Sequence, residues 1–112
     1  MTTAEKVLGQ KATAATTAWD LYTCTAPVTS AVITCINVCN RGATSTTFRI
    51  SVRVAGAGQA NDHYQYYDVT IAAYQTIPLK DIRWTLSATD VITVYAGNAN
   101  LSFTAFGSER TN

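Results

Sequence analysis

The sequence has few charges and no long apolar run, and each shortage excludes a class of protein. Only 13% of the 112 residues are charged and the formal net charge is +1. The chain therefore lacks the clustered basic surface that binds DNA, RNA or acidic membranes. Its apolar runs span a few residues, far short of the roughly 20 that a transmembrane helix needs. We expect no nucleic-acid partner and no membrane span.

Groups that carry catalysis are also scarce. The chain has one histidine, His63, and seven carboxylates, and it contains no Gly-x-Ser-x-Gly, His-Glu-x-x-His or Walker motif. Asp62 precedes His63, but neighbouring residues on a strand point to opposite faces. We therefore interpret His63 as a turn residue at the start of a strand and not as a general base. We expect no enzyme activity, no catalytic residue, no cofactor and no small-molecule substrate.

The three cysteines are an odd number and make a poor disulfide framework. Cys35 and Cys39 lie about 13 Å apart on one predicted strand, beyond bridging distance, which leaves Cys24 as the one possible partner for either. With His63 these thiols could supply four zinc ligands, but they lack the paired spacing of a zinc knuckle. Residues 1–6 lack the basic start and apolar stretch of a signal peptide. We expect free thiols, no metal and assembly in a cytoplasm.

Alternation of apolar and polar residues with a period of two covers most of the chain, and no helical pattern of useful length accompanies it. This predicts an all-β fold, an antiparallel two-sheet β-sandwich of the jelly-roll or Ig-like kind with about eight short strands. Residues 18–112 are predicted to form a single domain, and residues 1–17 an N-terminal arm or an edge strand. The predicted strands are residues 18–24, 31–39, 46–54, 63–71, 76–79, 82–86, 91–96 and 100–106.

Turn sequences between neighbouring segments predict two hairpins, one from residues 31–39 and 46–54, the other from residues 91–96 and 100–106. Strict alternation also assigns side chains to faces. It places Tyr64 and Tyr66 together and Tyr67 on the opposite face. One face of residues 31–39 carries Val32, Thr34, Ile36 and Val38, and the inward face of residues 46–54 carries Phe48, Ile50, Val52 and Val54.

Aromatic and arginine side chains are the candidates for contacts with other proteins. Arg49 and Arg53 share one face of a strand and either lie in solvent or meet an acidic neighbouring subunit. The segment of residues 7–10 is either an edge strand of its own sheet or an arm that adds to a neighbour's sheet. Trp19, Tyr66 and Trp84 are the predicted anchors. The full set of candidate interface residues is Val7, Leu8, Trp19, Arg49, Arg53, Tyr64, Tyr66 and Trp84.

Several segments together resemble a family of small proteins encoded among the structural genes of tailed bacteriophages, including cyanophages and other marine phages. They span nearly the whole chain. The segments are residues 6–10, 14–17, 21–23, 38–44, 46–50 and 88–91. Cys24 and Cys35 stand where relatives are expected to have small or β-branched residues.

This resemblance implies an oligomeric virion accessory protein without an enzymatic site. We therefore expect a non-enzymatic virion structural protein that assembles in the host cytoplasm with copies of itself, for example as a trimer, and with other phage structural proteins. A capsid decoration or cement protein is favoured over a neck or tail component. The alternative is a host-recognition module of a tail fibre that binds carbohydrate through exposed tyrosines.

Overall fold

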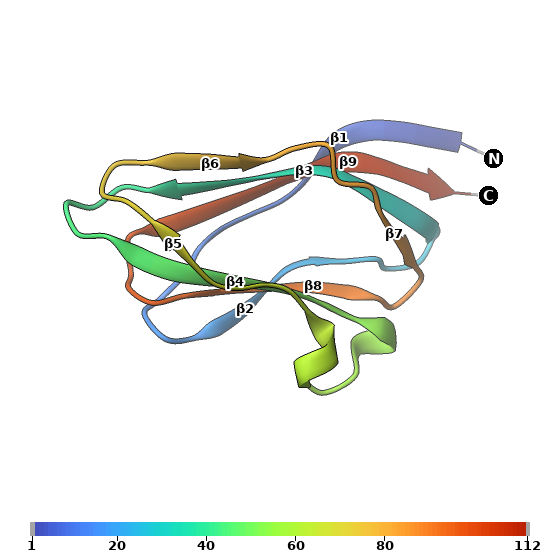
Figure 1. The fold of residues 1–112 in the computed structure, drawn as a ribbon. Coiled ribbons are helices and arrows are strands. Elements are labelled where there is room, and N and C mark those ends of the chain that lie inside the picture. The colour runs from blue at the N-terminus through green and yellow to red at the C-terminus, as the bar shows by residue number, and fades with distance from the viewer. Residues whose placement is uncertain (1, 112) are drawn as a thin grey trace.

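The computed structural model describes residues 2–111 and consists of two antiparallel sheets packed face to face, with extents of 45 × 27 × 21 Å (Figure 1). The predicted antiparallel two-sheet β-sandwich is confirmed. Met1 and Asn112, the outer ends of the predicted segments 1–17 and 18–112, lie outside the described residues. None of the described residues belongs to a helix long and apolar enough to cross a membrane.

The order of the strands is that of a jelly roll. One sheet has the order β1-β9-β3-β6, with β7 also paired to β3, and the other has the order β2-β8-β4-β5. β6 and β7 act as two parts of one edge strand along β3, so that eight strand positions remain, as in a jelly roll. The five-stranded sheet contains β1 (Thr2–Ala12), β9 (Leu101–Thr111), β3 (Val28–Asn40), β6 (Thr76–Leu79) and β7 (Trp84–Ser87). The four-stranded sheet contains β2 (Ala18–Thr23), β8 (Val91–Ala96), β4 (Thr46–Arg53) and β5 (Tyr64–Ile71).

Both predicted hairpins are wrong. β3 pairs with β9, β6 and β7, whereas β4 pairs with β5 and β8, so the turn between β3 and β4 carries the chain from one sheet to the other. The turn between β8 and β9 does the same. A short polar turn reverses the chain whether the next strand pairs with the last one or crosses to the facing sheet. Consecutive strands form a hairpin at β4 and β5, through the exposed residues 54–62 and His63.

A bulge in β3 changes which residues face the core. The register with β9 shifts between Ile33 and Cys35, so that Ile33 and Ile36 are both fully buried although strict alternation would separate them. Of the residues predicted to share one face, Ile36 and Val38 are buried, whereas Thr34 is exposed, so the prediction of a common face is wrong for Thr34. Val32, one residue before the buried Ile33, lies on the outer face.

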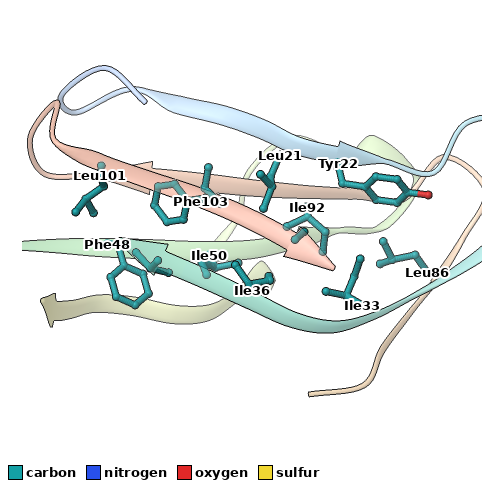
Figure 2. Close-up of a cluster of buried hydrophobic side chains, with 14 of the residues drawn as sticks. Leu21, Tyr22, Ile33, Ile36, Phe48, Ile50, Leu86, Ile92, Leu101 and Phe103 are labelled. Carbon is teal, nitrogen blue, oxygen red and sulfur yellow. The ribbon is translucent and has the colours of Figure 1, made fainter. Parts of the chain in front are cut away.

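The core lies between the sheets and receives side chains from both (Figure 2). Phe48 and Phe103, both fully buried, meet edge to face with their ring centroids 6.3 Å apart, while Tyr22 lies toward the other end of the labelled cluster. The predicted inward positions of Phe48 and Ile50 are confirmed. Val54 is 65% exposed because β4 ends one residue earlier, and this part of the prediction is wrong.

Candidate interaction surfaces

The outer face of the four-stranded sheet carries a cluster of tyrosine rings around one arginine, here called the tyrosine–arginine cluster: Arg49, Tyr64, Tyr67 and Tyr95. The guanidinium carbon of Arg49 lies 4.3 Å from the centroid of the Tyr67 ring and 4.6 Å from that of Tyr95. Tyr64 meets Tyr67 edge to face at 4.8 Å between centroids. Tyr95 is directly opposite Arg49 in the register of β8 and β4. The four side chains form one contiguous cation–π and aromatic group.

Asp68 fixes the arginine in this position. Arg49 Nε donates to Asp68 Oδ1 at 2.6 Å and a terminal nitrogen of Arg49 donates to Oδ2 at 3.3 Å, which is a bidentate pair. This hydrogen bond lowers the pKa of the Asp68 carboxyl and raises the pKa of Arg49. Arg49 therefore finds its acidic partner in its own chain, and its charge is not left free for an acidic neighbour.

An irregularity in β5 brings the tyrosines together. The register of β4 and β5 shifts twice, once between Phe48 and Ile50 and once between Ile50 and Ser51. Asp68, with a φ of 50°, lies at the first shift. At the second shift Tyr66 is opposite Ile50 and Tyr64 is opposite Ser51, so Tyr66 turns inward and Tyr64 joins Tyr67 outside. The predicted pairing of Tyr64 with Tyr66 on one face is wrong, because strict alternation does not survive a bulge.

Arg53 also finds partners within the chain. Its Nε donates to Thr93 Oγ1 at 3.0 Å, and its terminal nitrogens donate to Asp20 Oδ1 at 3.0 Å and to the carbonyl oxygen of Ala57 at 2.8 Å. These bonds tie the loop after β4 to β2 and β8. Arg53 therefore holds this loop against β2 and β8 at the end of the four-stranded sheet.

The three predicted anchors have different surroundings. Tyr66 and Trp84 are half-buried, with ring centroids 6.0 Å apart, and Tyr66 also contacts Phe48 at 6.4 Å. They close the sandwich along the edge between β5 and β7. Trp19 is 40% exposed, with the Lys11 ammonium 4.9 Å from its ring centroid. Of the three, Trp19 is the one that presents substantial area to a partner without opening the core.

Val7 and Leu8 lie on β1, which pairs with β9 and is one edge strand of the five-stranded sheet. A bulge between Val7 and Gly9 turns Leu8 toward the core, while Val7 stays 48% exposed. Glycine is needed at position 9, because a Cβ there would overlap the carbonyl oxygen of Leu21 on β2. The edge-strand alternative thus describes β1 within one chain. Addition of this segment to a neighbour's sheet stays a prediction.

The outer face of the five-stranded sheet is nearly free of charge. Among the paired residues of its strands, the two charged ones, Glu5 and Arg110, lie at one end, since Glu5 pairs with Ser108 and Arg110 with Thr3 and Ser30. The exposed Lys80, Asp81 and Arg83 lie at the edge of the sheet, in the loop between β6 and β7. By the same register, the rest of this face is built from small polar and apolar side chains. They are Val7, Gln10 and Ala12 on β1, Ser102, Thr104, Phe106 and Ser108 on β9, and Val32, Cys35, Asn37 and Cys39 on β3.

A hollow of about 530 Å³ lies on this face, where the bulges of β1 and β3 flank β9. Its lining includes Val7, Thr34 and Phe106, and also the charged residues Glu5 and Lys6. The Thr34 hydroxyl donates to the carbonyl oxygen of Phe106 at 3.3 Å. The two bulges thus replace a flat surface with a shallow depression beside the largest apolar side chain of the face.

A polar network joins β1, β2 and β9 at the edge of the sandwich. The Tyr22 hydroxyl donates to Glu109 Oε2 at 2.6 Å, and Lys6 Nζ lies 2.5 Å from Glu109 Oε1. Hydrogen bonds from Lys6 and Tyr22 lower the pKa of Glu109, and burial together with the bond to Glu109 raises the pKa of Tyr22. Sequence reasoning missed this network because its members are far apart in the chain.

His63 has a structural position. Its Nδ1 accepts a hydrogen bond from the Ala60 amide at 3.1 Å, which closes the short turn Asn61–His63 before β5. Its Nε2 lies 3.7 Å from an oxygen of Asp62, whose side chain is 86% exposed. A ring nitrogen that accepts a backbone N–H is not free to act as a base, so this geometry favours the interpretation as a turn residue.

The cysteines are separated by the fold. Cys24 is fully buried, and burial raises the pKa of its thiol. Cys35 and Cys39 are half-buried on the outer face of the five-stranded sheet. All three are free. Across residues 2–111, no group of three or more His, Cys, Asp or Glu side chains is arranged to hold a metal ion.

No protein-family model matches this sequence, and no curated protein is significantly similar to it. The resemblance to phage structural proteins therefore stays a prediction. The fold and its two contrasting outer faces are the observations on which a function can be argued.

Proposed function

We propose that this chain is a non-enzymatic structural protein of a phage particle, which binds other structural proteins through the tyrosine–arginine cluster. A capsid decoration or cement protein is the form we favour, with a neck or tail component as the other. The phage assignment rests on the sequence resemblance. The mode of action rests on the cluster.

The observation that carries the binding role is that Arg49 is held between two tyrosine rings on an open sheet face. Tyrosine and arginine are enriched at protein interfaces and among the residues that dominate their energetics. Asp68 fixes the guanidinium and Tyr64 packs on Tyr67, which is 56% exposed. Side chains ordered before binding lose less conformational entropy when a partner arrives.

Binding to the particle is the first test. If a phage genome carries the gene, mass spectrometry of that phage's particles, purified by density, should find this chain. Purified protein added to particles that lack it should bind them, and Tyr67→Ala should weaken binding by about 30-fold, the effect of a hot-spot residue. Tyr74→Ala is the matched control, since Tyr74 is 73% exposed and lies outside the cluster. Absence of the chain from particles, or equal binding by both variants, would refute the proposal.

A carbohydrate-binding module of a tail fibre is the second candidate, favoured by the exposure of Tyr67. The same ring has Arg49 packed over it, which leaves less of its face for stacking on a sugar. A glycan array separates the two functions. Specific glycan binding that is lost in Tyr67→Ala would support the host-recognition role over the structural one.

A further inference from the structure

We propose that the outer face of the five-stranded sheet binds the same face of a second copy of this chain and forms a two-fold symmetric dimer. The inference names one partner of an assembly protein and so rests on the proposed function. It uses a different surface from the tyrosine–arginine cluster. The two can therefore fail separately.

Charge is the first argument. The paired strands place two charged residues on this face, Glu5 and Arg110 at one end. The loop between β6 and β7 adds the exposed Lys80, Asp81 and Arg83 along one edge of the sheet. The opposite outer face of the sandwich carries the two ion pairs Arg49–Asp68 and Arg53–Asp20. The charges of this sheet thus lie at one end and along one edge, and the paired strands leave the middle of the face uncharged. Charges at the rim of an interface keep contact with water, so little charge is desolvated when a second copy binds.

Area is the second argument. Neighbouring strands are about 4.8 Å apart, so four strands abreast span roughly 19 Å. β1 and β9 contain 11 residues each, which corresponds to about 36 Å at ~3.3 Å per residue. The face thus covers about 700 Å², close to the ~800 Å² that each partner buries in a stable interface. A second copy of the same face matches it in size, and a surface that binds itself produces two-fold symmetry.

Shape is the third argument. Serine, threonine and valine side chains keep most of the face shallow, which suits the close packing of two sheets about 10 Å apart. The hollow between Val7, Phe106 and the charged Glu5 and Lys6 interrupts this surface and gives a projecting side chain of the second copy a place to enter. Val7 is 48% exposed, so an apolar contact in this region removes valine surface from water.

The test is the mass of the full chain in solution, measured by light scattering on a sizing column over a wide concentration range. We expect the wild type to be a dimer. Thr104→Glu adds a charge at the middle of the face, between Gln10 and Asn37 in the register, and should weaken dimerisation by at least 100-fold. Gln10→Glu, at an exposed position, is a second variant that tests the same point if Thr104→Glu does not fold.

Thr70→Glu is the matched control. Thr70 is exposed on the four-stranded sheet, opposite Thr47, and the variant should remain a dimer. Alkylation of Cys39 gives a second readout, since the dimer should protect this thiol and Thr104→Glu or Gln10→Glu should restore its reactivity. A monomeric wild type, or an oligomer that survives the charges on this face, would overturn the inference. A monomeric wild type that still binds particles would refute the dimer and leave the proposed function standing. A dimeric wild type that binds no particles would refute the proposed function alone.

Discussion

Replacing Tyr22 with phenylalanine should destabilise the protein in a pH-dependent way. The hydroxyl of Tyr22 donates to Glu109 at 2.6 Å, Tyr22 is 7% exposed and the Glu109 side chain is 13% exposed, so water screens this bond little. Hydrogen bonds to charged groups contribute about 1.5–3 kcal/mol. Because Glu109 keeps Lys6 as a partner, we expect Tyr22→Phe to lower the free energy of unfolding at pH 7 by about 2 kcal/mol.

The pH dependence follows from the lowered pKa of Glu109, whose ordinary value is 4.5. A carboxyl with a depressed pKa in the folded state stabilises the protein fully above its unfolded-state pKa, and this contribution disappears as the pH falls through the folded-state pKa. Without the Tyr22 hydroxyl the pKa of Glu109 is depressed less. The difference in stability between wild type and Tyr22→Phe should therefore be largest at pH 7 and should shrink below about pH 4.

Urea denaturation at pH 7 and at pH 3 measures both effects. With a slope of roughly 1–3 kcal/mol per molar urea for a domain of this size, the midpoint at pH 7 should fall by about 1 M. Tyr74→Phe removes the same hydroxyl from a side chain that is 73% exposed and should change stability by less than about 0.5 kcal/mol. An unchanged midpoint for Tyr22→Phe at pH 7, or an equal loss at both pH values, would refute this reasoning.

Two further predictions concern the core and the sheet contacts. Gly107→Ala places a Cβ against the carbonyl oxygen of Val32, which belongs to the main chain and cannot rotate away. Thermal unfolding should show that this variant loses more than roughly 2 kcal/mol of unfolding free energy. Gly58→Ala, with nothing within 4 Å of its added Cβ, should be nearly neutral. In native protein kept monomeric by dilution, iodoacetamide should modify Cys39 well before Cys24, because Cys24 is fully buried and its raised thiol pKa leaves less thiolate. Equal rates at the two thiols would contradict the burial of Cys24.

The sequence predicts the fold class because period-two alternation is a local property of a strand. It does not predict which strands pair. β3 and β4 are joined by a short turn, yet the partner of Val38 is Phe103, far along the chain. Pairing of this kind is decided by which arrangement buries both apolar faces, and a turn sequence carries no information about it. This is why both predicted hairpins were wrong while most of the strands themselves were found.

Bulges explain why the candidate surface was only partly predicted. Arg49 and Tyr64 were named from composition and alternation, but Tyr67 was placed on the wrong side relative to Tyr64 because the register shift between Tyr64 and Tyr66 breaks the period of two. A bulge inside a tyrosine-rich strand leaves little signal in the sequence. Tyr95 joins the cluster through the pairing of β8 with β4, which again is long-range information.

The two proposed surfaces lie on opposite sides of the sandwich, and this arrangement determines what a dimer could do. If two copies pack through their five-stranded sheets, the four-stranded sheets become the outermost layers, separated by three sheet spacings of about 10 Å each, or roughly 30 Å. The two tyrosine–arginine clusters then point away from each other. Such a dimer cannot place both clusters on one flat surface and gains no avidity there. It can join two separate protein surfaces that face each other across the dimer.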